Sequence, residues 1–369
     1  MKFTIDAKSL LQATQIIIGA IDRKQALPIL GNVLVTVQGE NQLSLLATDL
    51  EVELSSHVSL TQNAENGQIT VPARKLHDIC RSLDPNTILQ CKLTDQRFII
   101  KTAESRFALQ TLPALDFPNI ETTSHQHSFK ISQKELRYLL EQTHFAIALQ
   151  DIRYYLTGLL LELKDQQIRA VATDGHRMAL CSMMVNTDLG FHQIIIPRRG
   201  VMELLRLLQD NEEEIEIILG QNHIRAISTS FTFSSKLIDG KYPDYNKVIP
   251  KFTDNLIHLS RDVFKSTLNR VTILSNEDFR GVSLRWEENK LILQSHNNLY
   301  EEAEEKIDIS YLRTPVQMGF NASYLTDVLS AISAAEIELM IPEDQNSLLL
   351  QPRNNKLASC IFIIMPVIL

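Results

Sequence analysis

The stretch Asp174-Gly175-His176-Arg177 holds three side chains that could do chemistry, at close spacing. An aspartate and a histidine this near could act as an acid–base pair. Asp-Gly also suits a simple turn, and the similar stretch Asp49-Leu50-Glu51-Val52 has no histidine. We see no glycine-rich phosphate loop, Gly-x-Ser-x-Gly elbow or paired-carboxylate signature. We therefore expect no catalytic residues. The enzyme alternative predicts that loss of His176 abolishes turnover, whereas a binding protein would only lose affinity.

Histidine and cysteine, the usual metal ligands, are too scattered to suggest a metal site. His125 and His127 lie two apart in a polar stretch with no further ligands nearby, so we interpret them as linker residues. The cysteines form no Cys-x-x-Cys pair and have apolar flanks: Cys80, Cys91, Cys181 and Cys360. Reduced, buried thiols are expected, with no disulfide, metal or cofactor.

Length and composition predict an ordinary globular protein. The 369 residues suggest two or three domains, and 44% are hydrophobic and 22% charged. No apolar run approaches the ~18–20 residues that span a membrane, and the start MKFTIDAKSL lacks a secretory signal. Cytoplasmic localisation is therefore expected. The net charge of −8 argues against nucleic-acid binding unless the lysines and arginines are clustered.

One unit recurs along the chain. Ala47-Thr48-Asp49 is repeated 125 residues later as Ala172-Thr173-Asp174. The same shift relates VPARKL at Val71 to IPRRGV at Ile196, and FPNI at Phe117 to YPDY at Tyr242. A fainter third copy contains GFNASYLTDVLSAI, shifted by 124. Such repeats indicate tandem units. We therefore predict three domains: 1–124, 125–251 and 252–369.

Each unit shows the same order of elements. A short β run opens it, then comes a helix with apolar positions three and four apart, such as Leu136, Leu139 and Leu140. Alternating strands follow, and a second helix starts near a proline in the first two copies, as at Pro72 and Pro197. This order predicts α+β domains with two helices on antiparallel sheets in each copy. The expected helices are 7–18, 73–83, 133–147, 198–209, 261–272 and 322–333.

Charge separates the helices from the rest of the chain. The six predicted helices hold 12 of the 36 lysines and arginines but only 6 of the 44 acids. Bases often lie on solvated helix faces, but the total favours one basic surface built from helices. Tandem copies can close into a ring. Twelve helices of ~10 Å diameter, from two chains, would leave a bore of very roughly 28 Å, wide enough for duplex DNA.

These residues resemble the β subunit of bacterial DNA polymerase III, the sliding-clamp family, over essentially the whole chain. The most specific segments are LPILGNVLV (27–35), ATDLEVEL (47–54), TVPARKLHDICRSL (70–83), SRFALQTLPALDFPN (105–119), QDIRYYLTGLLLE (150–162), VATDGHRMALCSM (171–183), IIPRRGVMELLRLL (195–208), SKLIDGKYPDY (235–245), ILSNEDFRGV (273–282) and MPVIL (365–369). The resemblance implies three DNA-clamp domains, a closed dimeric ring around DNA, and a processivity factor without catalysis of its own.

The resemblance also implies a pocket for partner peptides between the second and third domains. Its positions here are Leu156, Thr173, Gly175, His176, Arg177, Met178, Pro243, Lys247, Val248, Ile363, Ile364, Met365, Pro366, Val367, Ile368 and Leu369. Apolar side chains would accept a partner's Leu or Phe, and methionine adapts to several partners. Lys247 stands where the family favours arginine, and Ile368 where it favours a basic residue, so guanidinium or cationic contacts are lost at the groove mouth. Because Pro366 should end the last strand, we expect Val367–Leu369 to project beside Leu156, Met178 and Val248.

Further roles follow from the same resemblance. The DNA contacts would be Lys24, Gln150, Tyr154 and Tyr155, although Lys24 also suits a solvated loop and one tyrosine could pack in the core. The dimer interface would join Phe107 and Leu109 to Ile273 and Leu274 of the other chain. The implied partners are duplex DNA, a second copy, the replicative polymerase α subunit, the clamp loader, other polymerases and mismatch-repair proteins. A repeat scaffold without a DNA role is a third hypothesis, and retention on circular but not linear DNA would exclude it.

Overall fold

The computed structural model describes residues 1–21, 27–39, 41–60, 64–118, 127–185, 189–251, 256–276, 279–355 and 357–369. The chain forms two compact units, one of residues 1–134 with 199–237 and the other of 135–198 with 238–369. None of the described helices is long and apolar enough to cross a membrane.

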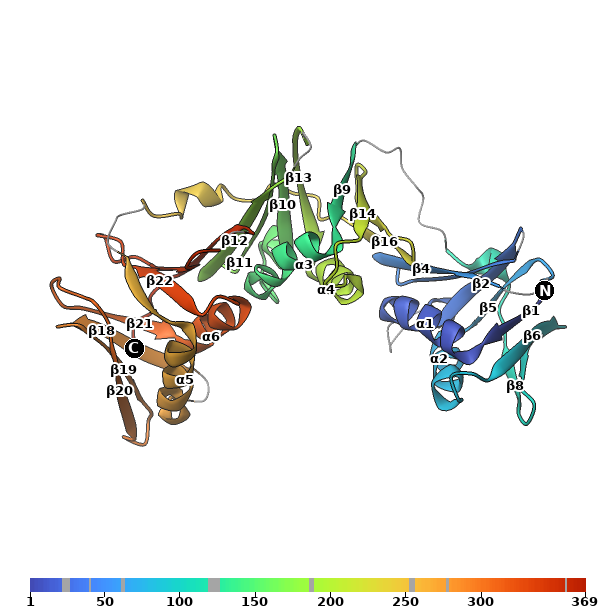
Figure 1. Ribbon diagram of the computed structural model, residues 1–369, viewed down its shortest axis with the longest axis horizontal. Helices are drawn as coiled ribbons and strands as arrows, with labels where there is room; N and C mark the ends of the chain where they lie inside the picture. The colour runs from blue at the N-terminus through green and yellow to red at the C-terminus, as the bar shows by residue number, and fades with distance from the viewer. Residues whose placement is uncertain are drawn as a thin grey trace. The chain divides into compact units, whose positions relative to one another are not determined.

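The same series of elements, βαββββαβββ, occurs three times (Figure 1). The first copy runs β1 (Lys2–Asp6), α1 (Ala7–Ile17), β2 (Asn32–Gln38), β3 (Gln42–Thr48), β4 (Val52–Ser59), β5 (Gly67–Pro72), α2 (Ala73–Ser82), β6 (Ile88–Thr94), β7 (Arg97–Lys101) and β8 (Arg106–Gln110). The second runs β9 (His127–Ser132), α3 (Gln133–Glu141), β10 (Gly158–Lys164), β11 (Gln167–Thr173), β12 (Arg177–Met184), β13 (Phe191–Pro197), α4 (Arg198–Leu207), β14 (Glu214–Leu219), β15 (His223–Ile227) and β16 (Phe231–Lys236). The third runs β17 (Ile257–Ser260), α5 (Arg261–Val271), β18 (Gly281–Glu287), β19 (Lys290–His296), β20 (Glu302–Asp308), β21 (Val316–Asn321), α6 (Ala322–Ala331), β22 (Glu336–Met340), β23 (Leu348–Pro352) and β24 (Ser359–Ile364).

The α+β architecture expected from the repeat is confirmed. The six helices begin where the sequence predicted, and five end within two residues of the prediction. The third ends at Glu141 instead of 147, and a short 3-10 turn, His144–Ala146, follows it. Asp6 caps α1 by accepting a hydrogen bond from the Ser9 amide at 2.8 Å, so this helix begins at Ala7.

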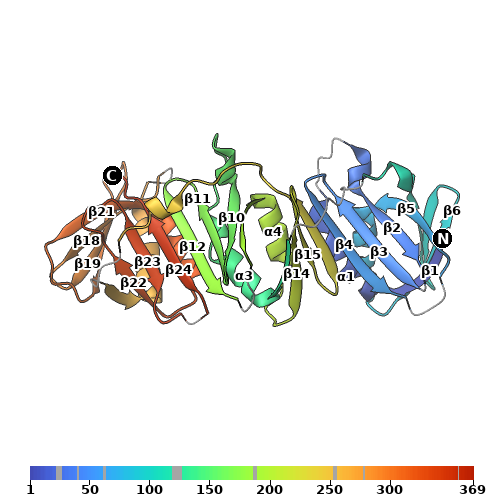
Figure 2. The same cartoon turned by 90° about the horizontal axis from the view of Figure 1, so that it is seen from above.

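The sheets join one copy of the repeat to the next. In the first unit the order β5-β2-β3-β4-β16-β15-β14-β9 combines strands of the first and second copies, and in the second unit β13-β10-β11-β12-β24-β23-β22-β17 combines the second and third. The strands of each eight-stranded sheet can be followed in Figure 2. The antiparallel pairs β4·β16 and β12·β24 are the two seams, and the second pairs Arg177 with Ile364 and Ser182 with Ser359.

Two four-stranded sheets complete the chain, one in each unit: β1-β6-β7-β8 and β20-β19-β18-β21. Strand β8 is equivalent by the repeat to β16 and β24, and β20 is equivalent to β4 and β12. Within the described part of the chain, β8 and β20 each have one free edge, whereas the equivalent strands β16, β24, β4 and β12 pair with one another to form the two seams. Such unpaired edges are ready to pair with another strand.

Alternating side chains place the cores between helices and sheets. In α1, Leu10, Ala13 and Ile17 are buried at helical spacing, and the helix packs on β3 and β4. In the second unit a further apolar cluster lies beneath the segment that includes Tyr242 and Tyr245, which are both buried.

The cysteine prediction is right for two residues and wrong for two. Cys80 and Cys91 are buried free thiols. Cys181 and Cys360 form a disulfide, because the β12·β24 register places them directly opposite each other with their Cα atoms 4.1 Å apart. Sequence spacing could not reveal this pair, since the partners are 179 residues apart.

Candidate functional site

The candidate peptide pocket is built within the second unit, on the seam β12·β24. Its floor is apolar: Leu156, Met178 and Ile363 are each at most 3% exposed and belong to one buried cluster with Tyr242 and Tyr245. The segment after β16 supplies the accessible side, where Pro243, Lys247 and Val248 are exposed. Leu156, Met178 and Ile363 therefore meet in one buried cluster at the seam, and Pro243, Lys247 and Val248 lie exposed on the segment that also carries the buried Tyr242 and Tyr245.

The turn between β11 and β12 forms one end of this site. The Asp174 carboxylate accepts hydrogen bonds from the amides of His176 and Arg177 at 2.9 and 3.0 Å, and the Gly175 amide donates to the Thr173 hydroxyl. Gly175 has a φ of 89°, which a residue with a side chain rarely adopts. The turn leaves Gly175 and His176 exposed.

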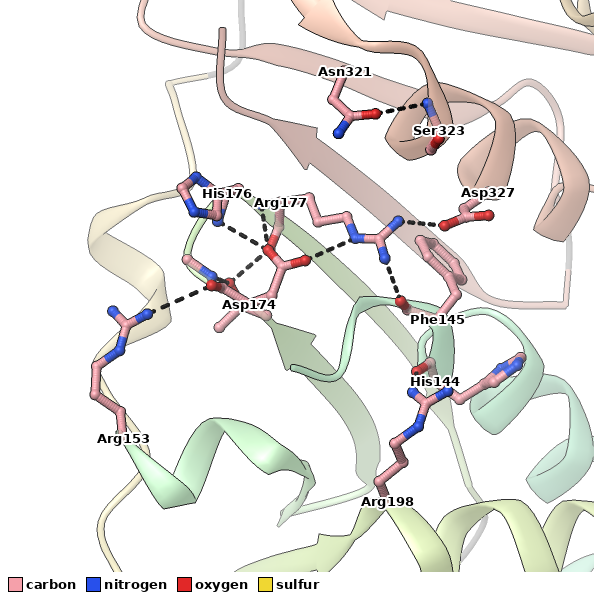
Figure 3. Close-up of polar contacts among 12 residues, drawn as sticks. His144, Phe145, Arg153, Asp174, His176, Arg177, Arg198, Asn321, Ser323 and Asp327 are labelled. Atoms are coloured by element: carbon pink, nitrogen blue, oxygen red, sulfur yellow. Dashed lines mark hydrogen bonds and ion pairs between the residues drawn. The ribbon is translucent and has the colours of Figure 1, made fainter. Parts of the chain in front are cut away.

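The acid–base pair that Asp174 and His176 could have made is not formed. The Asp174 side chain binds backbone amides and the Arg177 guanidinium, while the exposed His176 ring points away from it (Figure 3). No cluster of three metal-ligating side chains occurs among the described residues. The arrangement suits binding.

The C-terminal tail is held by backbone hydrogen bonds after β24 ends. Strand β24 ends at Ile364, and the Met365 amide donates to the His176 carbonyl at 2.8 Å. The Val367 amide then donates to the Gly319 carbonyl at 2.8 Å, so the chain forms an isolated bridge with β21. The tail therefore has a contact with β21 that was not expected, and the projection of Val367–Leu369 beside Leu156, Met178 and Val248 stays a prediction.

Two glycines explain why the tail lies on β21. A Cβ atom on Gly281 or Gly319 would meet the Leu369 side chain at 2.5 or 2.6 Å, so the leucine rests on bare backbone. Within the tail only Ile368 is fully exposed. Sequence periodicity could not show this contact, because it depends on two distant glycines in neighbouring strands.

The expected DNA contacts lie in two different settings. Gln150 is exposed, whereas Lys24 lies outside the described residues. Tyr154 and Tyr155 begin a 3-10 helix, Tyr154–Thr157. Tyr154 is 57% exposed, and Tyr155 packs against the apolar cluster. Only Tyr154 therefore offers an accessible ring.

The loop before these tyrosines has features that the sequence analysis did not single out. Leu149 and Ile152 are 76% and 99% exposed. Arg153 donates to Asp151 through two nitrogens, at 3.0 and 2.8 Å, and this hydrogen bonding lowers the pKa of Asp151 to about 2. The ion pair stabilises a loop whose apolar side chains face solvent. The sequence did not predict this loop, because it has no periodic pattern.

The four expected interface residues lie near the two sheet edges. Phe107 and Leu109 belong to β8, where Phe107 is half-buried and Leu109 is only 7% exposed within its own sheet. Ile273 and Leu274 form the 3-10 turn Thr272–Leu274 after α5, and Ile273 is 75% exposed. Ile273 and Phe107 thus retain the apolar surface that a partner could cover.

Comparisons with known proteins agree with this architecture. Three domain models of the DNA polymerase III beta subunit match in order: the N-terminal domain at residues 1–121, the central domain at 130–244 and the C-terminal domain at 246–367. These matches define the class of protein, a chain of three tandem clamp domains.

Full-length relatives agree with the domain matches. The chain is 47% identical over 367 residues to a beta sliding clamp of Pseudomonas putida and 41% identical over 366 residues to that of Escherichia coli K12, with 99% of each chain covered. A crystal structure of the DNA polymerase III subunit beta from Pseudomonas aeruginosa covers all of both chains at 44% identity, with a TM-score of 0.95. Another, of that organism's sliding clamp bound to griselimycin, has a TM-score of 0.96, 44% identity and full coverage of both chains.

This chain belongs to the DNA polymerase III beta subunit family, the beta sliding clamps. It is a processivity factor of DNA replication and has no catalytic activity of its own. The family expected from the sequence is therefore confirmed, and the enzyme alternative is excluded by family membership.

Proposed function

We propose that the chain acts as a head-to-tail dimer that encircles duplex DNA in the cytoplasm and tethers polymerases through its peptide pocket. The pairing of sheet edges carries this proposal. Two seams, β4·β16 and β12·β24, join successive copies of the repeat, and the third pair of equivalent edges is β20 and β8. A second copy would provide the missing partner for each edge. The domains would span 1–124, 125–251 and 252–369.

Charge favours the same pairing. Five bases line a cavity of about 540 Å³ on the sheet that ends at β8: Lys2, Lys92, Arg97, Lys101 and Arg106. Strand β20 carries Glu302, Glu304 and Asp308 on one face, with Lys306 as the base among them. Only Arg106 of these bases lies on β8 itself, and Asp95 also lines the cavity, but the opposite net charges of the basic sheet and of β20 would steer and orient association.

Dimer formation can be tested at the apolar contact. Replacing Ile273 and Leu274 with alanine removes side chains whose burial contributes roughly 1.5–3 kcal/mol each. We expect a folded monomer by light scattering at low micromolar concentration. The matched control Met184→Ala changes an apolar side chain that is 65% exposed at the end of β12, a strand of neither edge sheet, and should remain dimeric. A dimeric double variant would exclude this interface.

DNA would be held because the closed ring surrounds it, and because lysines and arginines contact it without reading its sequence. Several helix bases already bind the chain itself, as in the pairs Arg199–Asp49, Arg206–Glu203 and Arg270–Glu305. Ion pairs of Lys8, Lys75 and Lys265 are not seen among the described residues. We propose that such lysines face the duplex, together with Lys24, Gln150, Tyr154 and Tyr155.

Free binding to short DNA should therefore be weak and steeply dependent on salt. Each phosphate contact that releases a counterion contributes a slope of about −0.9 to log K against log [salt]. Fluorescence anisotropy between 50 and 200 mM salt would measure it, with duplexes of unrelated sequence as controls. A clear preference for one sequence at moderate salt would contradict topological binding.

The pocket would take the short linear motifs of the polymerase α subunit, the clamp loader, other polymerases and mismatch-repair proteins. The related Pseudomonas aeruginosa clamp is known bound to griselimycin. In this chain the apolar floor and exposed rim provide anchoring for a partner's Leu or Phe. The rim bears Lys247 beside Asp244 at 3.8 Å, so its charge is partly compensated.

A further inference from the structure

Arg177 lies at one end of the second unit's seam, opposite Ile364, with its guanidinium bound on three sides. Nε donates to the Asp174 carboxylate at 3.0 Å, one terminal nitrogen to the Asp327 carboxylate at 2.6 Å, and the other to the Phe145 carbonyl at 2.7 Å (Figure 3). The guanidinium carbon lies 4.4 Å from the centre of the Tyr324 ring. The side chain is 11% exposed. A peptide in the pocket would find little of this group available.

The groups around Arg177 come from both copies that meet at the seam. Asp174 and Phe145 belong to the second copy, whereas Asp327 and Tyr324 belong to α6 of the third. Asp174 also shapes the turn that carries His176, and the His176 carbonyl accepts the Met365 amide. One arginine therefore connects α6 to the turn and to the tail that border the pocket.

The first unit has a similar connection at the corresponding place. Asp49 accepts hydrogen bonds from the amides of Glu51 and Val52, as Asp174 does from those of His176 and Arg177. Asp49 also pairs with Arg199 of α4, whose other nitrogen donates to the Gly19 carbonyl. The arginines come from different elements, but each binds the aspartate of an Ala-Thr-Asp triplet at a seam.

The third copy provides an internal comparison. Its corresponding turn, between β19 and β20, begins with Asn297, whose side-chain oxygen accepts the amides of Leu299 and Glu301. An asparagine is thus sufficient to shape the turn. The negative charge occurs only in the two turns that meet a following copy within the chain, so its role lies in binding the arginine.

We propose that Asp174, Arg177 and Asp327 form a clasp that positions the peptide pocket by fixing the β11–β12 turn to α6, and that Asp49 and Arg199 form the equivalent clasp in the first unit. Arg177 is therefore a positioning residue, with His176 and Met365 as the groups it sets in place. This proposal rests on the proposed pocket. A guanidinium is suited to the role because its planar fork binds two carboxylates at fixed angles.

Asp327→Asn tests the clasp, because Asp327 is not among the residues assigned to the pocket. Amide hydrogen exchange should become at least fivefold faster in 174–182 and 359–365, with the melting temperature nearly unchanged. Binding of griselimycin, measured by calorimetry, should weaken at least fivefold. Asp327→Glu keeps the charge, so its amide exchange rates and its griselimycin affinity should lie closer to the wild-type values. The matched control Asp262→Asn removes an exposed helix aspartate paired with Arg261 and should change neither.

Asp49→Asn gives a second control in the same chain. It should speed exchange in 52–56 and 231–235 and leave griselimycin affinity unchanged. If wild-type protein binds griselimycin and Asp327→Asn binds equally well with normal exchange, the clasp is wrong and the pocket stands. If wild-type protein does not bind griselimycin, the pocket assignment is wrong, and the exchange rates alone decide whether the clasp exists.

Discussion

Individual residues at the seams form contacts that the neighbouring sequence does not predict. The Ala-Thr-Asp triplets were recognisable as repeated landmarks, and their aspartates predicted turns. The partners of those aspartates could not be predicted, because Arg177 and Asp327 are 150 residues apart, as are Asp49 and Arg199. Local patterns report turns and periodicity, whereas these contacts exist only once the seams have formed.

The cysteines give a prediction at this scale. Burial raises the pKa of Cys80 to about 12 and also raises the pKa of Cys91, so neither thiolate forms near neutral pH. Native protein at pH 8 should not react with a thiol reagent. Denatured protein should show two thiols without reductant and four after reduction, because Cys181 and Cys360 are joined.

The control for this titration is the Cys181→Ser variant. When it is denatured without reductant it should show three thiols, because Cys360 has lost its partner and adds to Cys80 and Cys91. Four thiols in unreduced, denatured wild-type protein would mean that the cross-strand bond is absent in solution.

Elements were predicted best where periodicity is strong. The amphipathic helices and the order of strands followed from apolar spacing and from the repeat. No periodic pattern covers Tyr154 and Tyr155, and the chain turns there in a 3-10 helix. The contact of the tail with β21 was not predicted, because it depends on Gly281 and Gly319, which provide bare backbone under Leu369.

Deleting Val367–Leu369 tests the role of the tail. Loss of the bridge between Val367 and Gly319 should release Met365 and Pro366 from their place beside His176. We expect binding of a polymerase-derived peptide, measured by calorimetry, to weaken at least tenfold, which corresponds to about 1.4 kcal/mol. Circular dichroism and light scattering should show an intact fold and unchanged assembly.

Ile368→Ala is the matched control for this deletion, because its side chain is fully exposed while the backbone of the tail is kept. It should retain most of the affinity. Wild-type affinity in the truncated, folded protein would show that the tail is structural and that the binding groove lies elsewhere.

For the whole molecule, the repeat explains both the fold and the proposed assembly. Three copies produce two seams within the chain and leave one matching pair of edges, β8 and β20. The sequence alone predicted three copies and a basic helical surface. It could not predict that many of those bases bind carboxylates or carbonyls of their own chain, as Arg206 does with Glu203 and the Gln15 and Ile16 carbonyls.

The central claim is that this chain encloses DNA as a ring, and retention on DNA tests it most directly. Protein loaded by a clamp loader onto a nicked circular plasmid would be separated from free protein by gel filtration at moderate salt, before and after a single restriction cut. We predict that the protein stays with the circle and is lost within minutes of linearisation, as it slides off the ends. Equal retention on circular and linear DNA would contradict the account.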